Sequence, residues 1–219
     1  MHSKDEQHIK ITADGSTTVY SKCFDQHYHS IFGAEKESEV VFIDLGLRLA
    51  FERFEEVNLL EMGFGTGLNA LLTKNFAESQ SKKVNYTGLE AFPITEEMIN
   101  QLNFDASHLH ILPWGEKVEV NDIFSFIKYN TTLQDFQSDQ KFNLVYYDAF
   151  APESQPELWT LEIFEKLYSL MEEGGVLTTY CSKGYVQRNL KAAGFMVEKH
   201  PGPPRKREIL RAIKLSWHD

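Results

Sequence analysis

The chain has 219 residues, of which 42% are hydrophobic and 25% charged, with two cysteines and a formal net charge of −10. This composition is ordinary for a globular protein with a sizeable core, and it excludes a wholly disordered chain. No apolar run is long enough for a transmembrane helix, no signal peptide is evident, and two cysteines cannot build a disulfide framework, so we expect a cytoplasmic protein with free thiols.

The first 45 residues are predicted to form an extension ahead of a main domain at 46–219. Two short runs of β-forming residues, 9–12 and 16–20, flank a turn sequence at 13–15 that is typical of a β-hairpin. Apolar residues at helical spacing predict an amphipathic helix over 43–54.

From residue 57 onward, strand and helix patterns alternate along the chain. Strands are expected at 57–62, 84–89, 117–120, 142–147 and 176–180, followed by a terminal pair at 195–199 and 208–215. Helices are expected at 68–77, 95–102, 123–129, 159–171 (stopped by the glycines at 174–175) and 185–193. This alternation predicts a mostly parallel sheet covered on both faces. Ligands bind such sheets beyond the carboxyl ends of the strands.

A glycine-rich loop follows the first of these strands: Glu61-Met62-Gly63-Phe64-Gly65-Thr66-Gly67. It differs from the dinucleotide pattern because Leu68 stands where the third glycine is needed, and it lacks the lysine of a P-loop. Glycines let the backbone turn tightly and approach a ligand. The carboxylate of Glu61 suits a cationic group, such as the ammonium of S-adenosylmethionine. The alternative is a glycine-rich turn with a surface glutamate.

Two more acids end neighbouring predicted strands. Glu90 follows the strand at 84–89, where a carboxylate can accept hydrogen bonds from both ribose hydroxyls of an adenosine. Asp122 follows the strand at 117–120 and is placed to accept from an adenine amino group. An N-cap for the predicted helix at 123–129 explains Asp122 equally well.

Asp148 ends the strand at 142–147 and begins the sequence Asp148-Ala149-Phe150-Ala151-Pro152. In a doubly wound sheet this position lies at the central carboxyl edge, beside the glycine loop. A protonated amine has no lone pair with which to attack a methyl group, and a carboxylate can hold it, take its proton and orient the nitrogen. The ring of Phe150 can pack on a planar substrate. The alternative is a turn that Asp148 caps.

Three segments resemble the bacterial tRNA 5-methylaminomethyl-2-thiouridine methyltransferases: EMGFGTGLN at 61–69, YDAFAP at 147–152 with PELWT at 156–160, and AAGFMVEKHPGPPRKREILRA at 192–212. The resemblance runs from residue 14 to 212 and is to the stand-alone form, not to the form fused to a flavin-dependent oxidase. It implies an α/β class I S-adenosylmethionine-dependent methyltransferase with a Rossmann-like, mostly parallel seven-stranded sheet. The implied reaction is N-methylation of 5-aminomethyl-(2-thio)uridine at the tRNA wobble position, with S-adenosylhomocysteine as product.

The resemblance also implies residue roles. The donor would be held by the glycine loop, by the later acids and by an aromatic residue of the extension, and the extension would close over the donor. The implied donor-binding residues are Tyr28, Glu61, Gly63, Phe64, Gly65, Thr66, Gly67, Asn69, Glu90, Ala91 and Asp122. Asp148 would be the catalytic acid and would bind the amine substrate together with Phe150. The expected partners are the tRNA anticodon stem-loop and a separate flavin oxidase that supplies the aminomethyl precursor. The H-x-H pairs at 27–29 and 108–110 lack suitable partners, so no metal site is predicted.

The carboxy-terminal part of the chain is basic although the whole chain is acidic. Residues 183–219 hold nine Lys or Arg and three Asp or Glu. Arg205, Lys206 and Arg207 lie in a Gly/Pro-rich turn between the last two predicted strands, which favours a phosphate clamp for tRNA. The alternative is a basic edge that discourages strand pairing.

Two other functions stay open from the sequence. One is a small-amine N-methyltransferase or polyamine aminopropyltransferase, because an acidic body suits cationic substrates. The other is a tRNA-binding scaffold of the same fold without activity, since a fold by itself does not prove a function.

Overall fold

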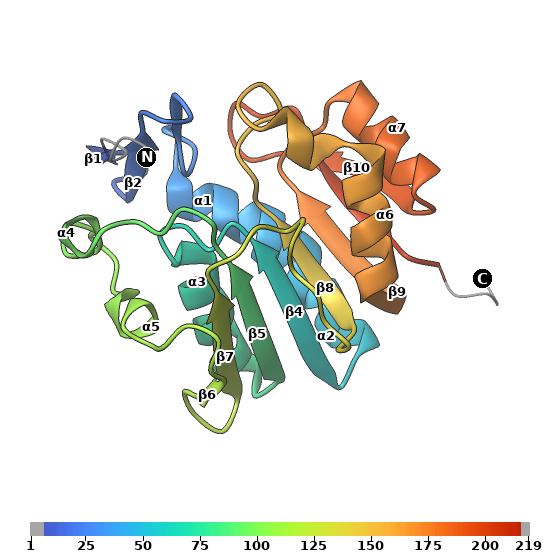
Figure 1. Ribbon diagram of the computed structural model, residues 1–219, viewed down its shortest axis with the longest axis horizontal. Coiled ribbons are helices and arrows are strands. Elements are labelled where there is room, and N and C mark those ends of the chain that lie inside the picture. The colour runs from blue at the N-terminus through green and yellow to red at the C-terminus, as the bar shows by residue number, and fades with distance from the viewer. Residues whose placement is uncertain (1–6, 216–219) are drawn as a thin grey trace.

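The computed structural model describes residues 7–215 (Figure 1). The chain begins with a small antiparallel sheet of three strands in the order β1-β2-β3: β1 (Gln7–Ile11), β2 (Thr17–Ser21) and β3 (Gln26–His27). The pairing of β1 with β2, in which Ile9 lies opposite Val19, confirms the predicted hairpin.

A continuous helical run connects this small sheet to the main one. It consists of α1 (Ala34–Ser38), a π-helical segment η1 (Glu39–Leu47) and α2 (Arg48–Arg53). The predicted helix at 43–54 lies in its second half, and the predicted domain boundary at residue 45 falls inside η1. Apolar residues of η1 such as Val41 and Phe42 are buried against the main sheet. The extension is therefore joined to the main domain by packed helix and not by a linker.

The main sheet has eight strands in the order β10-β11-β9-β8-β4-β5-β7-β6. The strands are β4 (Glu56–Met62), β5 (Lys83–Leu89), β6 (Val118–Glu119), β7 (Phe124–Tyr129), β8 (Phe142–Tyr147), β9 (Met171–Thr179), β10 (Met196–Pro201) and β11 (Glu208–Ile213). The five central strands from β9 to β7 run parallel, while β11 is antiparallel to both β9 and β10. The mostly parallel sheet is confirmed. It has one strand more than expected, because β7 forms where a helix was predicted, and the two-residue β6 pairs antiparallel with it.

Helices cover both faces of this sheet (Figure 1). One apolar cluster packs α6 (Leu161–Leu170) and α7 (Gly184–Ala192) against one face, with the 3-10 turn η2 (Pro156–Trp159) beside them. The other cluster packs η1, α2 and α3 (Leu68–Gln80) against the opposite face. Two short helices, α4 (Glu96–Ile99) and α5 (Ser107–His110), lie between β5 and β6 in the chain. None of the helices in the described part of the chain is long and apolar enough to cross a membrane.

The predicted helix at 123–129 was wrong, because these residues form β7. Phe124, Phe126 and Lys128 alternate into the interior, which is the two-residue period of a strand. Asp122 therefore lies in the connection between β6 and β7, just before β7, and not at the carboxyl end of a parallel strand. It lies beside Glu56 and Lys83 at the opposite, amino edge of the sheet, so its predicted place in an adenine site is wrong as well.

Two smaller expectations also need correction. The helix α6 ends at Leu170 and β9 begins at Met171, so the glycines at 174–175 lie within a strand and do not stop the helix. The expected helix at 95–102 is reduced to the single turn of α4, with Thr95 as its N-cap.

Candidate active site

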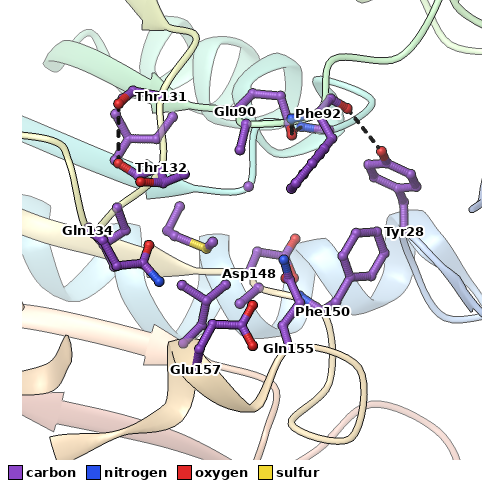
Figure 2. Close-up of a pocket in the computed structure, with 18 of the residues that line it drawn as sticks. Tyr28, Glu90, Phe92, Thr131, Thr132, Gln134, Asp148, Phe150, Gln155 and Glu157 are labelled. Carbon is purple, nitrogen blue, oxygen red and sulfur yellow. Dashed lines mark hydrogen bonds between the residues drawn. The ribbon is translucent and has the colours of Figure 1, made fainter. Parts of the chain in front are cut away.

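A cavity opens at the carboxyl edge of β4, β5, β7 and β8 (Figure 2). Its walls are formed by the glycine loop and by the loops that follow β5, β7 (131–134) and β8. Tyr28 and His29 of the extension also line it. Its empty volume, including the open mouth, is about 810 Å³. We call it the main cavity.

The glycine loop is shaped by close contacts on two sides. A Cβ atom at Gly63, whose φ is +93°, would lie 2.6 Å from the backbone oxygen of Asp148. A Cβ at Gly65, whose φ is +51°, would lie 2.8 Å from the ring of Tyr28. Both positions therefore require glycine, for backbone conformation and for space. They bring the loop against Asp148 on one side and under Tyr28 on the other.

Glu90 holds the loops on either side of the cavity. Its carboxylate accepts hydrogen bonds from the backbone N–H groups of Gly65 and Phe92, each at 2.8 Å. Burial raises the pKa of Glu90, and these bonds to the ionised form lower it in part. Glu90 lines the main cavity in the place where the sequence predicted an acceptor for ribose hydroxyls.

An amide joins two buried carboxylates beneath the glycine loop. Nδ2 of Asn69 donates to Oε1 of Glu61 and to Oδ2 of Asp148, both at 2.9 Å. Burial raises the pKa of Glu61 well above its usual range. Of these two acids only Asp148 lines the cavity, so Glu61 acts on the site through Asn69.

The pKa of Asp148 is raised to about 7. Burial is the main cause, and the nearby carboxylate of Glu37 adds to it, while the hydrogen bond from Asn69 and the charge of Lys206 lower it. Asp148 is thus a carboxyl group that changes protonation near neutral pH.

A second cavity meets the main one at Asp148. The two share Tyr28, His29, Asp148, Ala149 and Phe150, and the second continues between the extension and the end of β9. Its far wall holds Glu37, Tyr180 and Lys206. Nζ of Lys206 lies 2.5 Å from Oε1 of Glu37 and 4.2 Å from the centre of the Tyr180 ring. We call it the side cavity.

Aromatic rings form the rim between the two cavities. The ring of Phe24 stacks on that of Phe150 with 4.5 Å between centroids, and Phe92 contacts Phe24 edge-on at 5.2 Å. Tyr28 packs edge-on against Phe150 and donates to the backbone oxygen of Phe92 at 3.4 Å (Figure 2). The rim presents π faces of the kind on which a planar base can stack.

The residues predicted from the sequence fall into three groups. Those that line the main cavity are Tyr28, Gly63, Gly65, Glu90, Ala91, Asp148 and Phe150. Those buried behind its wall are Glu61, Phe64, Thr66, Gly67 and Asn69. The third group is the three cations of the predicted phosphate clamp, which the structure places in different surroundings. Lys206 faces the side cavity, and Arg207 is exposed. The guanidinium of Arg205 lies 4.5 Å from the ring centre of Phe32.

Sequence reasoning missed several residues of the two cavities. His29 shares a 2.7 Å hydrogen bond with the buried hydroxyl of Thr66, and burial lowers its pKa to about 4, so it is neutral. Thr131, Thr132 and Gln134 line the main cavity after β7 and were missed together with that strand (Figure 2). Residues 7–215 contain no group of three His, Cys, Asp or Glu side chains placed to hold a metal ion.

Comparison with known proteins identifies the architecture. Residues 89–215 match the model of a family described as S-adenosyl-L-methionine-dependent methyltransferases. The crystal structure of MNMC2 from Aquifex aeolicus superposes with a TM-score of 0.78 at 28% identity, covering 98% of this chain and 73% of that one.

Two further structures share the fold at lower identity. Spermidine synthase from Thermotoga maritima has a TM-score of 0.60 at 12% identity, covering 99% of this chain and 71% of that one. The SAM-bound amino pentose methyltransferase CalS10 from Micromonospora echinaspora has a TM-score of 0.52 at 14% identity, covering 82% and 91%.

Proposed function

The chain belongs to the S-adenosyl-L-methionine-dependent methyltransferase family, and from this premise we propose that it N-methylates 5-aminomethyl-(2-thio)uridine at the wobble position of tRNA. The observation that carries the proposal is the meeting of two cavities at Asp148. A transfer between two substrates needs both to reach one point, and here a titratable carboxyl group lies at that point. The sequence resemblance supplies the identity of the acceptor.

The main cavity fits S-adenosyl-L-methionine, the cofactor of this family. Gly63 and Gly65 line its wall, and their lack of side chains lets the loop pack closely against Asp148 and under Tyr28 at the edge of the cavity. In the proposal, Glu90 accepts the ribose hydroxyls. The loop after β7, with Thr131 and Gln134, takes the adenine end that the sequence had assigned to Asp122. Tyr28, which covers Gly65, supports the proposed closing role of residues 1–45 over the donor.

The side cavity is the proposed acceptor site. An ammonium group beside Asp148 is attracted by its carboxylate, which can then take the proton and orient the nitrogen lone pair. S-adenosyl-L-methionine supplies a methyl group on a cationic sulfur. One proton of the ammonium would pass to Asp148 before the transfer. The neutral amine would then form the N–C bond to this methyl group as the S–C bond breaks with its electron pair left on sulfur, so that the product would be the methylated ammonium. A pKa of about 7 lets this carboxyl group both accept and release the proton near neutral pH.

Basic residues near the side cavity support an RNA substrate. Arg205 and Arg207 lie on the β10–β11 turn, and Lys183, Arg188 and Lys191 are exposed on or beside α7. We propose that this surface contacts the anticodon stem-loop, in the cytoplasm, with a separate flavin oxidase supplying the precursor. Binding that depends on phosphate contacts weakens steeply as salt rises. Affinity for tRNA that stays flat between low and moderate salt contradicts this docking surface.

The test offers the purified protein three kinds of acceptor with S-adenosyl-L-methionine. These are tRNA that bears 5-aminomethyluridine, the same tRNA without it, and polyamines. Nucleoside mass spectrometry should show one added methyl group on the first acceptor only. Asp148→Asn should lower kcat by about 10²- to 10⁴-fold while donor binding, measured by calorimetry, persists. Methylation of polyamines alone identifies a small-amine N-methyltransferase. Transfer to polyamines only in a parallel assay with decarboxylated S-adenosyl-L-methionine identifies an aminopropyltransferase. Donor binding without any transfer identifies the scaffold.

A further inference from the structure

A third cavity continues from the side cavity between α1 and the β10–β11 turn. It is lined by Phe32, Lys36, Pro203, Pro204 and Arg205, and it shares Ser30, Phe32, Glu37 and Lys206 with the side cavity. A molecule that occupies the side cavity can therefore extend into it. We call this third cavity the basic subsite.

Both walls of the basic subsite are held in tight backbone conformations. A Cβ atom at Gly202 would collide with the backbone oxygen of Lys206, and one at Gly33, whose φ is +142°, would lie 2.8 Å from Oδ2 of Asp14. Arg205 itself has a φ of +71°, which is uncommon for a residue other than glycine. Backbone of this kind persists where its surroundings fix it, and it is enriched at ligand sites.

The charges of the subsite are not equally available. Lys206 is paired with the buried Glu37, and Lys36 lies 3.2 Å from Glu39, with both side chains largely exposed. Arg205 forms no ion pair with any residue that the structure describes. Its guanidinium is instead held over the ring of Phe32, which is 45% exposed. A stacked guanidinium keeps its planar set of donors for a phosphate.

We propose that the basic subsite binds the phosphodiester group next to the acceptor uridine, with Arg205 as its main ligand, Lys36 as a second cation and Phe32 holding the guanidinium in place. This inference rests on the proposed function and adds to it a reason for substrate choice. An acceptor then needs a cationic amine at Asp148 and an anionic group a short distance away. A polyamine offers positive charge at both places and is rejected by Arg205.

The kinetic test compares acceptors that differ by one phosphate. The wild-type protein is assayed with 5-aminomethyluridine, with its 3′- and 5′-monophosphates, and with a modified anticodon stem-loop. One of the two monophosphates should have a KM about tenfold lower than the nucleoside, the effect of one charge-assisted contact. In Arg205→Gln the ratio of the two KM values should fall toward one, and in Lys36→Gln it should fall less. The double variant Lys83→Gln, Lys117→Gln removes two cations at the opposite edge of the sheet and should keep the wild-type ratio.

A binding test gives a second readout that does not depend on turnover. The logarithm of the association constant for the stem-loop falls linearly with the logarithm of the salt concentration, and the slope becomes shallower by about 0.7 for each phosphate that the protein no longer neutralises. Arg205→Gln removes one such contact, so its slope should be shallower by about 0.7. Phe32→Leu removes the ring and keeps the charge, so affinity should fall while the slope stays near that of the wild type.

The outcomes separate this inference from the function on which it rests. If the aminomethyl acceptors are methylated with equal KM values, or if Arg205→Gln keeps both the KM ratio and the salt slope, the subsite is wrong and the proposed function stands. If no aminomethyl acceptor is methylated by the wild-type protein, the proposed function fails first.

Discussion

The protonation of Asp148 should control the rate of transfer. Burial and the charge of Glu37 raise its pKa to about 7, against the lowering effect of Asn69 and Lys206. A carboxyl group with that pKa is ionised in about 9% of molecules at pH 6 and about 91% at pH 8. If the ionised form is the one that binds and deprotonates the amine, kcat/KM should rise about tenfold over this interval.

Other titratable groups also face Asp148, and they respond differently to pH. Glu61 faces it through Asn69 from β4, and burial raises the pKa of Glu61 well above its usual range, so a step near pH 7 does not by itself identify Asp148. Tyr180 beyond β9 has a pKa raised well above its usual range by burial, and His29 from the extension stays neutral because its pKa is lowered to about 4. Glu37 and Lys206 form an ion pair. The step is assigned to Asp148 by its loss in the variant Asp148→Asn.

The assay measures initial rates at limiting tRNA and saturating donor from about pH 5.5 to about pH 9, where kcat/KM reports the free enzyme. Asn69→Leu removes a hydrogen bond that lowers the pKa of Asp148, so the step should move to higher pH. Asp148→Asn should remove the step and lower kcat by about 10²- to 10⁴-fold. Deprotonation of the free acceptor amine removes the ammonium that the carboxylate binds, so kcat/KM should fall again at higher pH. A flat profile between pH 6 and pH 8, or a step that survives in Asp148→Asn, refutes the assignment.

Three further predictions concern the cavity wall and stability. Gly63→Ala should lower the free energy of unfolding by at least about 2 kcal/mol. The control Gly115→Ala is also at positive φ but has nothing within 4 Å of its Cβ, so it should lower this free energy by only about 1 kcal/mol. Equal losses in denaturant unfolding would contradict the contact of Gly63 with Asp148. Glu90→Ala should weaken donor binding about tenfold to hundredfold, and unchanged affinity in calorimetry would remove Glu90 from the donor site. Folding raises the pKa of Asp148 from about 4 to about 7, so this group lowers the stability of the wild type progressively between about pH 4 and about pH 7, and the penalty is complete above that. Asp148→Asn should therefore be more stable than the wild type at pH 8, by up to about 4 kcal/mol, and should gain least below pH 4. A thermal-unfolding difference that is the same at pH 8 and below pH 4 argues against the raised pKa.

The central strands could be predicted because their sequences allow few alternatives. β4, β5 and β8 are short apolar runs that end in glycine or acidic residues, and the structure has them within a residue of the expected bounds. β7 was misassigned because Lys128 obscures its alternation. The ammonium of Lys128 is buried yet satisfied, since it donates to the backbone oxygens of Leu109 and His110 and lies 4.5 Å from the centre of the Trp114 ring. A periodicity argument treats lysine as exposed, and this one is not.

The site divides in the same way between local and long-range features. The glycine loop and Asp148 were predictable, because each is a short motif at the end of a strand whose place in the sheet follows from the fold. The pairing of Glu37 with Lys206 joins residues 169 positions apart, and no local pattern predicts this contact, although the basic turn itself marked Lys206. The contact of Phe32 with Arg205 has the same origin. The acceptor side of the site is thus a product of tertiary structure.

The distribution of charge reconciles an acidic protein with the polyanionic substrate that we propose for it. A net charge of −10 opposes the approach of RNA, yet methyl transfer from a sulfonium to an amine needs carboxylates at its centre. The fold keeps Glu61 and Asp148 beneath the surface at the tips of β4 and β8, where they act over short distances. It carries the cations on the β10–β11 turn, which antiparallel pairing brings to the same edge of the sheet. An approaching stem-loop then meets Arg205 before it meets the acids. Reversing the charge of Arg205 should for that reason slow association more than it slows transfer once tRNA is bound.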